Sequence, residues 1–243
     1  MDKHSFLNSG IQNNQISVFD QNNPCYQFTG LQDSNELMLE ERYLRSCALK
    51  LAQQGDYSKA IALLSHLIDH HPENAVDYNN RGLIYFQSGD SQKAICDYNK
   101  ALNLNSKLAS AYNNRANYYA ACGQLNAALA DYEQALDLNP HHVRAWINRS
   151  ITLRDLGEYA EAIENLEIAL LFDQLKGNIW AERGRTYHLW GDWNCAIADY
   201  RRALTELPAL SSQNVSGYRL RLQIENWLNE LLFLKTNASN SSF

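Results

Sequence analysis

Small and apolar residues recur along this chain with a single period of 34 residues. Glycine and alanine both follow this period without a gap, and three of the four prolines are spaced by twice that interval. The glycines are Gly55, Gly89, Gly123, Gly157 and Gly191, and the alanines are Ala60, Ala94, Ala128, Ala162 and Ala196. Self-similarity at a fixed period indicates a repeat architecture. The chain therefore divides into five units, 41–74, 75–108, 109–142, 143–176 and 177–210.

The recurring residues predict two helices, A and B, joined by a tight turn in each unit. Glycine at repeat position 15 ends helix A, because glycine adopts the left-handed conformation after a helix without strain. Small residues at positions 8 and 20 let the two helices approach each other, and proline at position 32 stops helix B. Ten of the 14 tyrosines lie at positions 4, 11, 17 or 24, and Trp146, Trp180 and Trp193 occupy the same positions elsewhere. The aromatic residues are therefore expected to pack mostly between helices.

The period and its residues resemble the tetratricopeptide repeat (TPR), a helix–turn–helix unit. The family has a large aromatic residue, Leu, Gly or Ala, Tyr, Gly, Ala, an aromatic residue, Ala and Pro at fixed positions. The third unit has Tyr112, Arg115, Ala116, Tyr119, Gly123, Ala128, Tyr132, Ala135 and Pro140 there. The resemblance covers 170 of 243 residues. The residue sequences of the repeats are similar to those of bacterial tandem TPR proteins. It implies an all-α fold, an α-solenoid of five units in a right-handed superhelix.

The two ends of the chain depart from the repeat. The N-terminal segment is rich in Asn and Gln and has no periodic apolar pattern, whereas Asp33 and Glu36 fit a capping box at the start of a helix. Apolar residues from Leu220 to Leu232 follow helical spacing without matching another repeat, which is typical of a capping helix. We expect a disordered or loosely ordered tail at 1–33, a repeat domain at 34–210, a capping helix at 211–235 and a frayed end at 236–243.

A polar pair recurs in the repeats, and its first member lies at position 7, where the family normally has leucine. Repeat position 7 holds Arg81, Arg115, Arg149 and Arg183, with Cys47 in the first unit. Position 23 holds Asp97, Asp131, Asn165 and Asp199, with Leu63 in the first unit. Because the polar residues appear together and disappear together, we predict that arginine of helix A meets its partner of helix B inside each repeat. Such a partly buried pair fixes helix register, and removing one partner is costly.

In TPR arrays helix A lines the concave face, which implies a groove there. Asn80, Asn114 and Asn148 occupy repeat position 6, once per unit. An amide side chain both donates and accepts, so this ladder can pair with a peptide backbone of any sequence, similar to the asparagine ladder in the TPR domain of O-linked GlcNAc transferase. The alternative is that these asparagines are merely solvated. The candidate groove residues are Asn79, Asn80, Leu83, Phe86, Asn113, Asn114, Asn117, Arg144, Ile147, Asn148, Ile151, Arg154 and Arg185.

Charge adds a preference for the ligand. The whole chain carries −6, whereas the inward positions of helix A hold five arginines against Asp155 and Glu182. An extended, somewhat acidic segment with apolar anchors would suit such a groove. The clamp of chaperone-binding TPRs is matched only at Asn117 and Asn148, so a chaperone C-terminus is not expected. Occupation of the groove by the N-terminal tail is kept as an alternative that composition does not favour.

The remaining features exclude other classes of protein. No apolar run is long enough for a transmembrane helix, and the N-terminus has no secretory signal. The five cysteines form an odd set without a CxxC motif, which indicates free thiols in a reducing, cytoplasmic compartment. His66, His70 and His71 have the spacing of metal ligands, but histidine near the end of a helix also suits the helix dipole. We expect no metal, no cofactor and, since no catalytic set or phosphate loop can be assembled, no enzyme.

These observations predict a scaffold or assembly factor that binds a peptide-like segment of another protein in its concave groove. A first alternative is a TPR protein that self-associates and has no groove ligand. A second is an RNA-binding helical repeat, which the acidic net charge of −6 opposes. Neither a nucleic-acid nor a membrane partner is expected.

Overall fold

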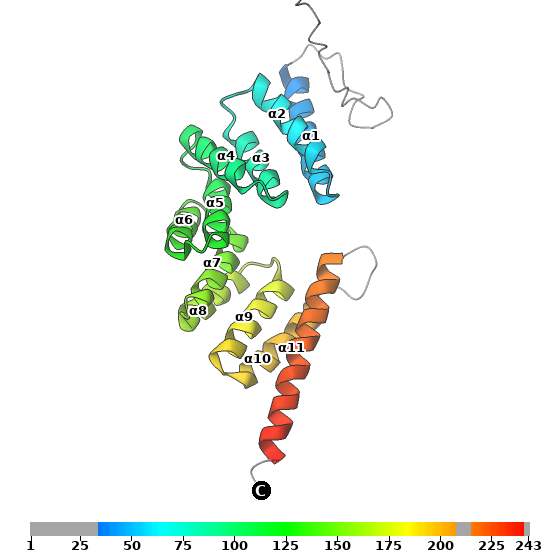
Figure 1. The fold of residues 1–243 in the computed structure, drawn as a ribbon, viewed down its shortest axis with the longest axis vertical. Coiled ribbons are helices and arrows are strands. Elements are labelled where there is room, and N and C mark those ends of the chain that lie inside the picture. The colour runs from blue at the N-terminus through cyan, green and yellow to red at the C-terminus, as the bar shows by residue number, and fades with distance from the viewer. Residues whose placement is uncertain (1–33, 208–214, 241–243) are drawn as a thin grey trace, which may run out of the picture.

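The computed structural model describes residues 34–207 and 215–240, so the prediction of a loose tail at 1–33 lies outside the described residues. Within these two stretches the chain forms α-helices and no strand (Figure 1). The helices are α1 (Ser34–Gln53), α2 (Tyr57–His70), α3 (Ala75–Gln87), α4 (Ser91–Leu104), α5 (Ala109–Ala121), α6 (Leu125–Leu138), α7 (Val143–Asp155), α8 (Tyr159–Leu170), α9 (Lys176–Trp190), α10 (Trp193–Glu206) and α11 (Val215–Asn240).

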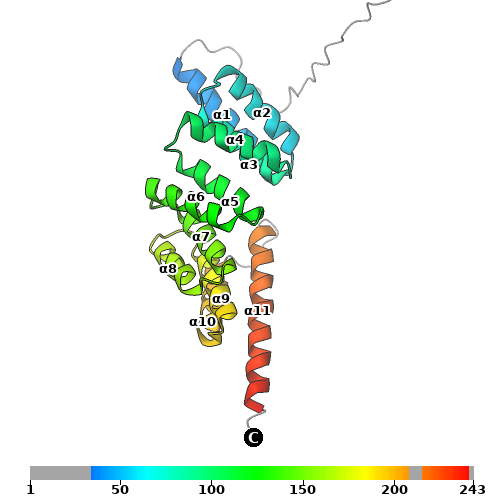
Figure 2. The ribbon, with the colours of Figure 1, turned by 60° about the vertical axis from the view of Figure 1, so that its left-hand side comes forward.

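The helices stack as successive pairs along the long axis of the molecule (Figures 1 and 2). Each odd-numbered helix from α1 to α9 packs on the even-numbered helix that follows it, and each even-numbered helix packs on the next pair. The odd-numbered helices also contact one another from pair to pair, so they form one continuous row, which is the helix A face. The predicted all-α solenoid of helix–turn–helix units is confirmed.

Local sequence determines where these helices begin and end. Asp56, Asp90 and Asp192 each cap a helix B, because their side chains accept a hydrogen bond from the backbone N–H three residues later. The glycines at repeat position 15 all have positive φ, for example 91° at Gly89 and 95° at Gly191. Only glycine adopts this conformation without steric cost, so it ends helix A and reverses the chain.

The tyrosines at repeat position 24 form the centre of the paired helices. Tyr98, Tyr132 and Tyr200 are buried, and the facing residue of helix A is small. A Cβ atom added to Gly184 would lie 2.7 Å from the ring of Tyr200, so a larger residue there would require the ring to shift. The expectation that aromatic residues pack between helices is confirmed at these positions. It is wrong for Trp193, which is 39% exposed because it lies at the turn between helices A and B.

The predicted polar pair is present in every unit from the second to the fifth. Arg81, Arg115 and Arg183 each donate two hydrogen bonds from Nε and Nη2 to both carboxylate oxygens of the aspartate sixteen residues later. Arg149 donates one bond from Nη1 to Oδ1 of Asn165, at 2.7 Å. A planar guanidinium matches a carboxylate at two points, so the pair holds helices A and B in one register.

The C-terminal helix packs on α10 and closes the end of the solenoid. Ile224 and Leu231 are buried against the fifth unit, and the ring of Trp227 stacks on Tyr200 with centroids 5.7 Å apart. α11 continues to Asn240, so part of the segment 236–243 that we expected to fray is helical. No glycine or proline follows Leu234 to stop the helix. Among the described residues, no helix has both the length and the hydropathy that crossing a bilayer requires.

Candidate functional site

A cavity of about 480 Å³ opens on the row of A helices. Its walls come from α3, α5, α7 and α9, together with the segments that precede α7 and α9. Seven of the predicted groove residues line it, namely Leu83, Asn113, Asn114, Asn117, Arg144, Ile147 and Asn148. The other lining residues are Gln87, His142, Leu175, Asn178 and Glu182. Four consecutive units therefore contribute to one site.

Asparagine side chains connect the neighbouring A helices beneath this cavity. The Nδ2 group of Asn114 donates to Oδ1 of Asn79 at 3.0 Å, and the Nδ2 group of Asn113 donates to Oδ1 of Asn114 at 3.2 Å. The Nδ2 group of Asn148 donates to Oδ1 of Asn117 at 2.9 Å and to Oδ1 of Asn113 at 3.3 Å. These bonds join α3 to α5 and α5 to α7, so the amides fix the spacing between units.

This network corrects the interpretation of the asparagine ladder. Asn114 is only 9% exposed, and Asn79 and Asn113 are more deeply buried. Of the predicted ladder, Asn114 and Asn148 are hydrogen-bonded to asparagines of the preceding unit, whereas Asn80 makes no hydrogen bond within the described chain. The polar groups that remain accessible at the cavity are those of Gln87, Arg144 and Asn178, which are exposed and make no hydrogen bond within the described chain.

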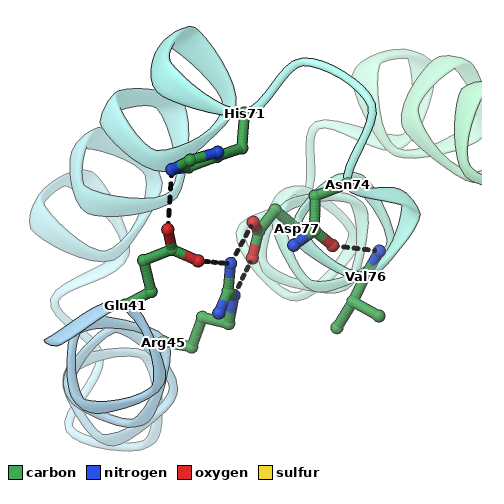
Figure 3. Close-up of polar contacts among 6 residues, drawn as sticks. All are labelled: Glu41, Arg45, His71, Asn74, Val76 and Asp77. Carbon is green, nitrogen blue, oxygen red and sulfur yellow. Dashed lines mark hydrogen bonds and ion pairs between the residues drawn. The ribbon is translucent and has the colours of Figure 1, made fainter. Parts of the chain in front are cut away.

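Two of the arginines expected to make the groove positive are paired with carboxylates. Arg154 forms an ion pair with Glu182, with Nη1 and Oε2 2.7 Å apart. At the N-terminal end, Arg45 binds both carboxylate oxygens of Asp77, a fully buried residue (Figure 3). Glu41 accepts a further bond from Arg45 and pairs with His71 on its other oxygen (Figure 3).

The charge sum in the sequence already included Glu182, the partner of Arg154, but it left out Glu41 and Asp77, which bind Arg45. Arg185 is also engaged, since its guanidinium lies 4.8 Å from the ring centroid of Trp227. Arg144 is therefore the cation that the cavity lining presents without an ion pair among the described residues. The preference for an acidic ligand now depends on Arg144.

Six predicted groove residues do not line the cavity. Asn79 lies below it as a hydrogen-bond partner, and Arg154 is paired with Glu182. Phe86 packs edge-on against Tyr118, with ring centroids 6.5 Å apart. The remaining three predicted residues that do not line the cavity are Asn80, Ile151 and Arg185.

The structure adds five lining residues to the predicted set. Gln87, Asn178 and Glu182 lie on A helices at positions that the sequence analysis placed on the inward face but did not choose as groove residues. His142 and Leu175 precede helices α7 and α9. No periodic signal marks these two, because they belong to the turn between units.

His142 has a structural role at the edge of the cavity. Its Nδ1 atom accepts a hydrogen bond from the backbone N–H of Ala145 at 3.2 Å and so caps α7. Burial lowers the pKa of His142 below its ordinary value, which favours the neutral imidazole. Only the neutral ring can accept this bond at Nδ1, so capping and burial favour the same protonation state.

The buried tyrosine hydroxyl groups beneath the groove differ between units in whether they make a hydrogen bond. The hydroxyl of Tyr132 donates to Oδ1 of Asn117 at 2.7 Å. The equivalent Tyr98 has no hydrogen-bond partner for its buried hydroxyl, because Leu83 takes the place of Asn117 in that unit. In the part of the chain that the structure describes, no group of three or more His, Cys, Asp or Glu side chains is arranged to hold a metal ion.

Comparison with known families identifies the repeat. Family profiles described as tetratricopeptide repeat match residues 109–142 and 131–164, and a profile described as TPR repeat matches residues 82–121. The chain is a tetratricopeptide repeat protein. Tetratricopeptide repeat proteins bind other proteins and are generally non-enzymatic scaffolds, so an interaction function is supported for this chain.

Solved structures agree with this fold. A thermophilic TPR protein of Thermus thermophilus is 20% identical, with a TM-score of 0.67 over 77% of this chain and 98% of that chain. A structure of MamA protein is 21% identical, with a TM-score of 0.56 over 70% of this chain and 98% of that chain. Another MamA structure is 22% identical, with a TM-score of 0.55 over 65% and 92% of the two chains. Identities this low indicate a shared fold only. Among curated protein sequences no match was found.

Proposed function

We propose that this tetratricopeptide repeat protein is a scaffold or assembly factor that holds an extended segment of a partner protein in its concave groove. The observation that supports the proposal is the cavity of about 480 Å³ to which four successive A helices contribute. Its volume is typical of a ligand pocket, and a segment of a few residues would fill it. A binding site shared by several units also suits an extended ligand better than a compact one.

The chemistry of the lining favours a peptide. The exposed amide groups of Gln87 and Asn178 offer both donors and acceptors, which match the alternating N–H and C=O groups of a peptide backbone. Leu83 and Leu175 supply apolar contact for one side chain of the ligand. The exposed guanidinium of Arg144 would pair with an acidic side chain or with a terminal carboxylate.

The test uses variants that change the cavity lining without changing the asparagine hydrogen-bond network beneath it. Peptides are selected from a displayed library of random sequences on the full chain and then measured against the double variant Arg144→Ala/Asn178→Ala. Both residues are exposed and unbonded within the described chain, so their removal leaves the asparagine network intact. We expect affinity to fall by about tenfold or more, because one charged and one neutral contact are lost.

The matched control is Arg201→Ala/Asn103→Ala, which removes the same residue types from exposed positions on the B helices. The selected peptides should bind this control as they bind the unmodified chain. Equal binding to the cavity variant and to the unmodified chain contradicts the groove. Asn114→Ala is a poorer test, since it breaks a bond that joins two units and so affects folding.

Self-association is the second candidate, and exposed apolar residues on both terminal helices favour it. Met38 and Leu39 are exposed on α1, and Leu222 and Phe233 are exposed on α11. Light scattering coupled to size-exclusion chromatography separates the candidates, since a monomeric mass across a wide concentration range excludes self-association. The proposed setting is a reducing, cytoplasmic compartment, where exposed thiols such as Cys96 and Cys122 persist.

A further inference from the structure

A second surface lies away from the groove, at the turns that join helix A to helix B in the fourth and fifth units. Leu156, Trp190 and Trp193 are exposed there, Trp190 with 52% of its surface. The ring of Tyr159 stacks on that of Trp190, with centroids 6.4 Å apart and an angle of 22° between the planes. A cavity of about 550 Å³ follows the turn from Trp190 to Asn194. Leu156, Tyr159, Trp190 and Trp193 are named the aromatic turn edge below.

The aromatic turn edge is surrounded by carboxylates that have no counter-ion. Segments 155–161 and 189–195 contain no lysine or arginine. Their acidic residues are Asp155, Glu158, Glu161 and Asp192, all of them exposed and none in an ion pair within the described part of the chain. The Asp192 carboxylate caps α10, and the other three carboxylates accept no hydrogen bond from the described residues.

The same turns in the first and second units are neutral. Asp56 pairs with Lys59 at 2.9 Å, and Asp90 pairs with Lys93 at 2.7 Å. The residues at those lysine positions in the fourth and fifth units are Glu161 and Cys195, so the compensating charge is missing. The aromatic side chains and the uncompensated acids therefore occur together at one end of the solenoid.

Two other tryptophan rings of this chain, those of Trp180 and Trp227, are covered by arginine. The guanidinium groups of Arg183 and Arg202 lie 4.6 Å and 4.7 Å from the ring centroid of Trp180. No cation lies over Trp190 or Trp193 among the described residues. Tryptophan is the best aromatic partner for a cation, and arginine can stack on a ring while its N–H groups bind a carboxylate.

We propose that the aromatic turn edge binds an arginine-bearing segment of a partner protein. Guanidinium groups of that segment stack on Trp190 and Trp193, and the surrounding carboxylates neutralise their charge. Lysine fits less well, because an ammonium group is a strongly hydrated point charge without a planar face. This site is separate from the groove, and its ligand carries the opposite charge to the one that Arg144 favours.

The experiment uses the full chain and a fluorescein-labelled peptide of alternating arginine and glycine, followed by anisotropy. Analogues with lysine or glutamate in place of arginine measure the contributions of stacking and charge. We expect the arginine peptide to bind, the lysine peptide to bind more weakly and the glutamate peptide not to bind. Trp190→Ala/Trp193→Ala should weaken binding of the arginine peptide by about tenfold or more, since two cation–π contacts are lost.

A matched pair of charge variants tests whether the site is specific. Glu158→Gln/Asp192→Asn and Asp56→Asn/Asp90→Asn both remove two charges from repeat position 16, in different units. The first should weaken binding of the arginine peptide, and the second should leave it unchanged. The first pair also stands in for the tryptophan variant if that variant fails to fold, because asparagine preserves the cap that Asp192 provides.

Four outcomes overturn the proposal. Equal loss in both charge variants means non-specific attraction to an acidic protein, and equal affinity for the arginine and lysine peptides removes the stacking argument. Absence of binding to the arginine peptide removes the site altogether. A fall in oligomer mass on Trp190→Ala/Trp193→Ala, measured by light scattering, assigns the aromatic turn edge to a second copy of this chain instead.

Discussion

The guanidinium of Arg115 binds the carboxylate of Asp131 at two points, with Nε 2.7 Å from Oδ2 and Nη2 2.9 Å from Oδ1. The two residues belong to different helices of one unit and are both mostly buried. The Arg115 guanidinium also lies between the rings of Tyr112 and Tyr119, with centroid distances of 5.6 Å and 5.8 Å. A buried charge held in this way is costly to leave alone, so its partner is expected to be strongly coupled to it.

A double-mutant cycle of Arg115→Ala and Asp131→Ala measures this coupling. We expect an interaction free energy of about 1–3 kcal/mol from urea denaturation of the four proteins. The matched cycle at Asp90 and Lys93 should give a smaller value, because water surrounds both groups and screens their attraction. Additive effects of Arg115→Ala and Asp131→Ala on the free energy of unfolding would show that the two-point bond contributes no interaction free energy.

The fourth unit offers a stabilising substitution. Asn165 accepts only one bond from Arg149, and the buried Nε of Arg149 has no partner. Asn165→Asp creates the carboxylate that the other units have and should raise the free energy of unfolding by about 1 kcal/mol or more. The reverse change, Asp131→Asn, should lower it. A destabilised Asn165→Asp protein would mean that the bond from Asn165 Nδ2 to the backbone carbonyl of Glu161 matters more.

Two buried tyrosines should respond differently to loss of their hydroxyl groups. Tyr132→Phe removes a hydrogen bond to Asn117 and should cost about 1 kcal/mol of stability. Tyr98→Phe removes a buried hydroxyl that has no partner, so stability should be unchanged or should increase. Thermal unfolding followed by circular dichroism compares the two proteins directly. A similar loss in both would mean that the Tyr98 hydroxyl is satisfied in solution.

The neighbouring asparagines of the groove floor provide another matched comparison. Asn114→Ala breaks the bond to Asn79 and leaves a buried acceptor unpaired, which should cost about 1–3 kcal/mol. Asn80→Ala, at the same position of the preceding unit, removes a half-buried side chain that makes no hydrogen bond within the described chain. Its effect should stay within about 0.5 kcal/mol. Equal losses of stability for Asn114→Ala and Asn80→Ala in chemical denaturation would contradict the distinction between asparagines that join two units and asparagines that make no hydrogen bond.

His142 makes stability depend on pH. Its pKa is lowered in the folded chain, so below its ordinary value of about 6.5 the unfolded chain binds a proton that the folded chain resists. Stability should therefore fall as pH decreases through and below that value. His142→Asn keeps a capping side chain without a titrating ring, so urea midpoints should fall less on acidification. Parallel pH profiles for the two proteins would exclude this role of His142.

The period of 34 residues alone determined the architecture of this protein. It predicted the paired helices, the positive φ of the turn glycines and the contact between residues such as Arg115 and Asp131. These features lie within one unit, and the same local geometry returns in each unit. The positive φ of a turn glycine depends on that glycine alone, and the close approach of helices A and B depends on a few small residues of the same unit. Both can therefore be predicted from the sequence of one unit.

Only the tertiary structure decided which polar groups are engaged. Asn80 and Asn114 occupy the same repeat position, yet Asn114 alone meets an asparagine of the adjacent unit. The charge of Arg45 is neutralised by an ion pair with Asp77, which lies in the next unit. Contacts of this kind depend on two side chains from different units and on their burial, so no residue pattern within one unit contains them. The exposure of Trp193 was likewise decided by the structure, because its ring lies at the turn between helices A and B, where no neighbouring helix covers it fully.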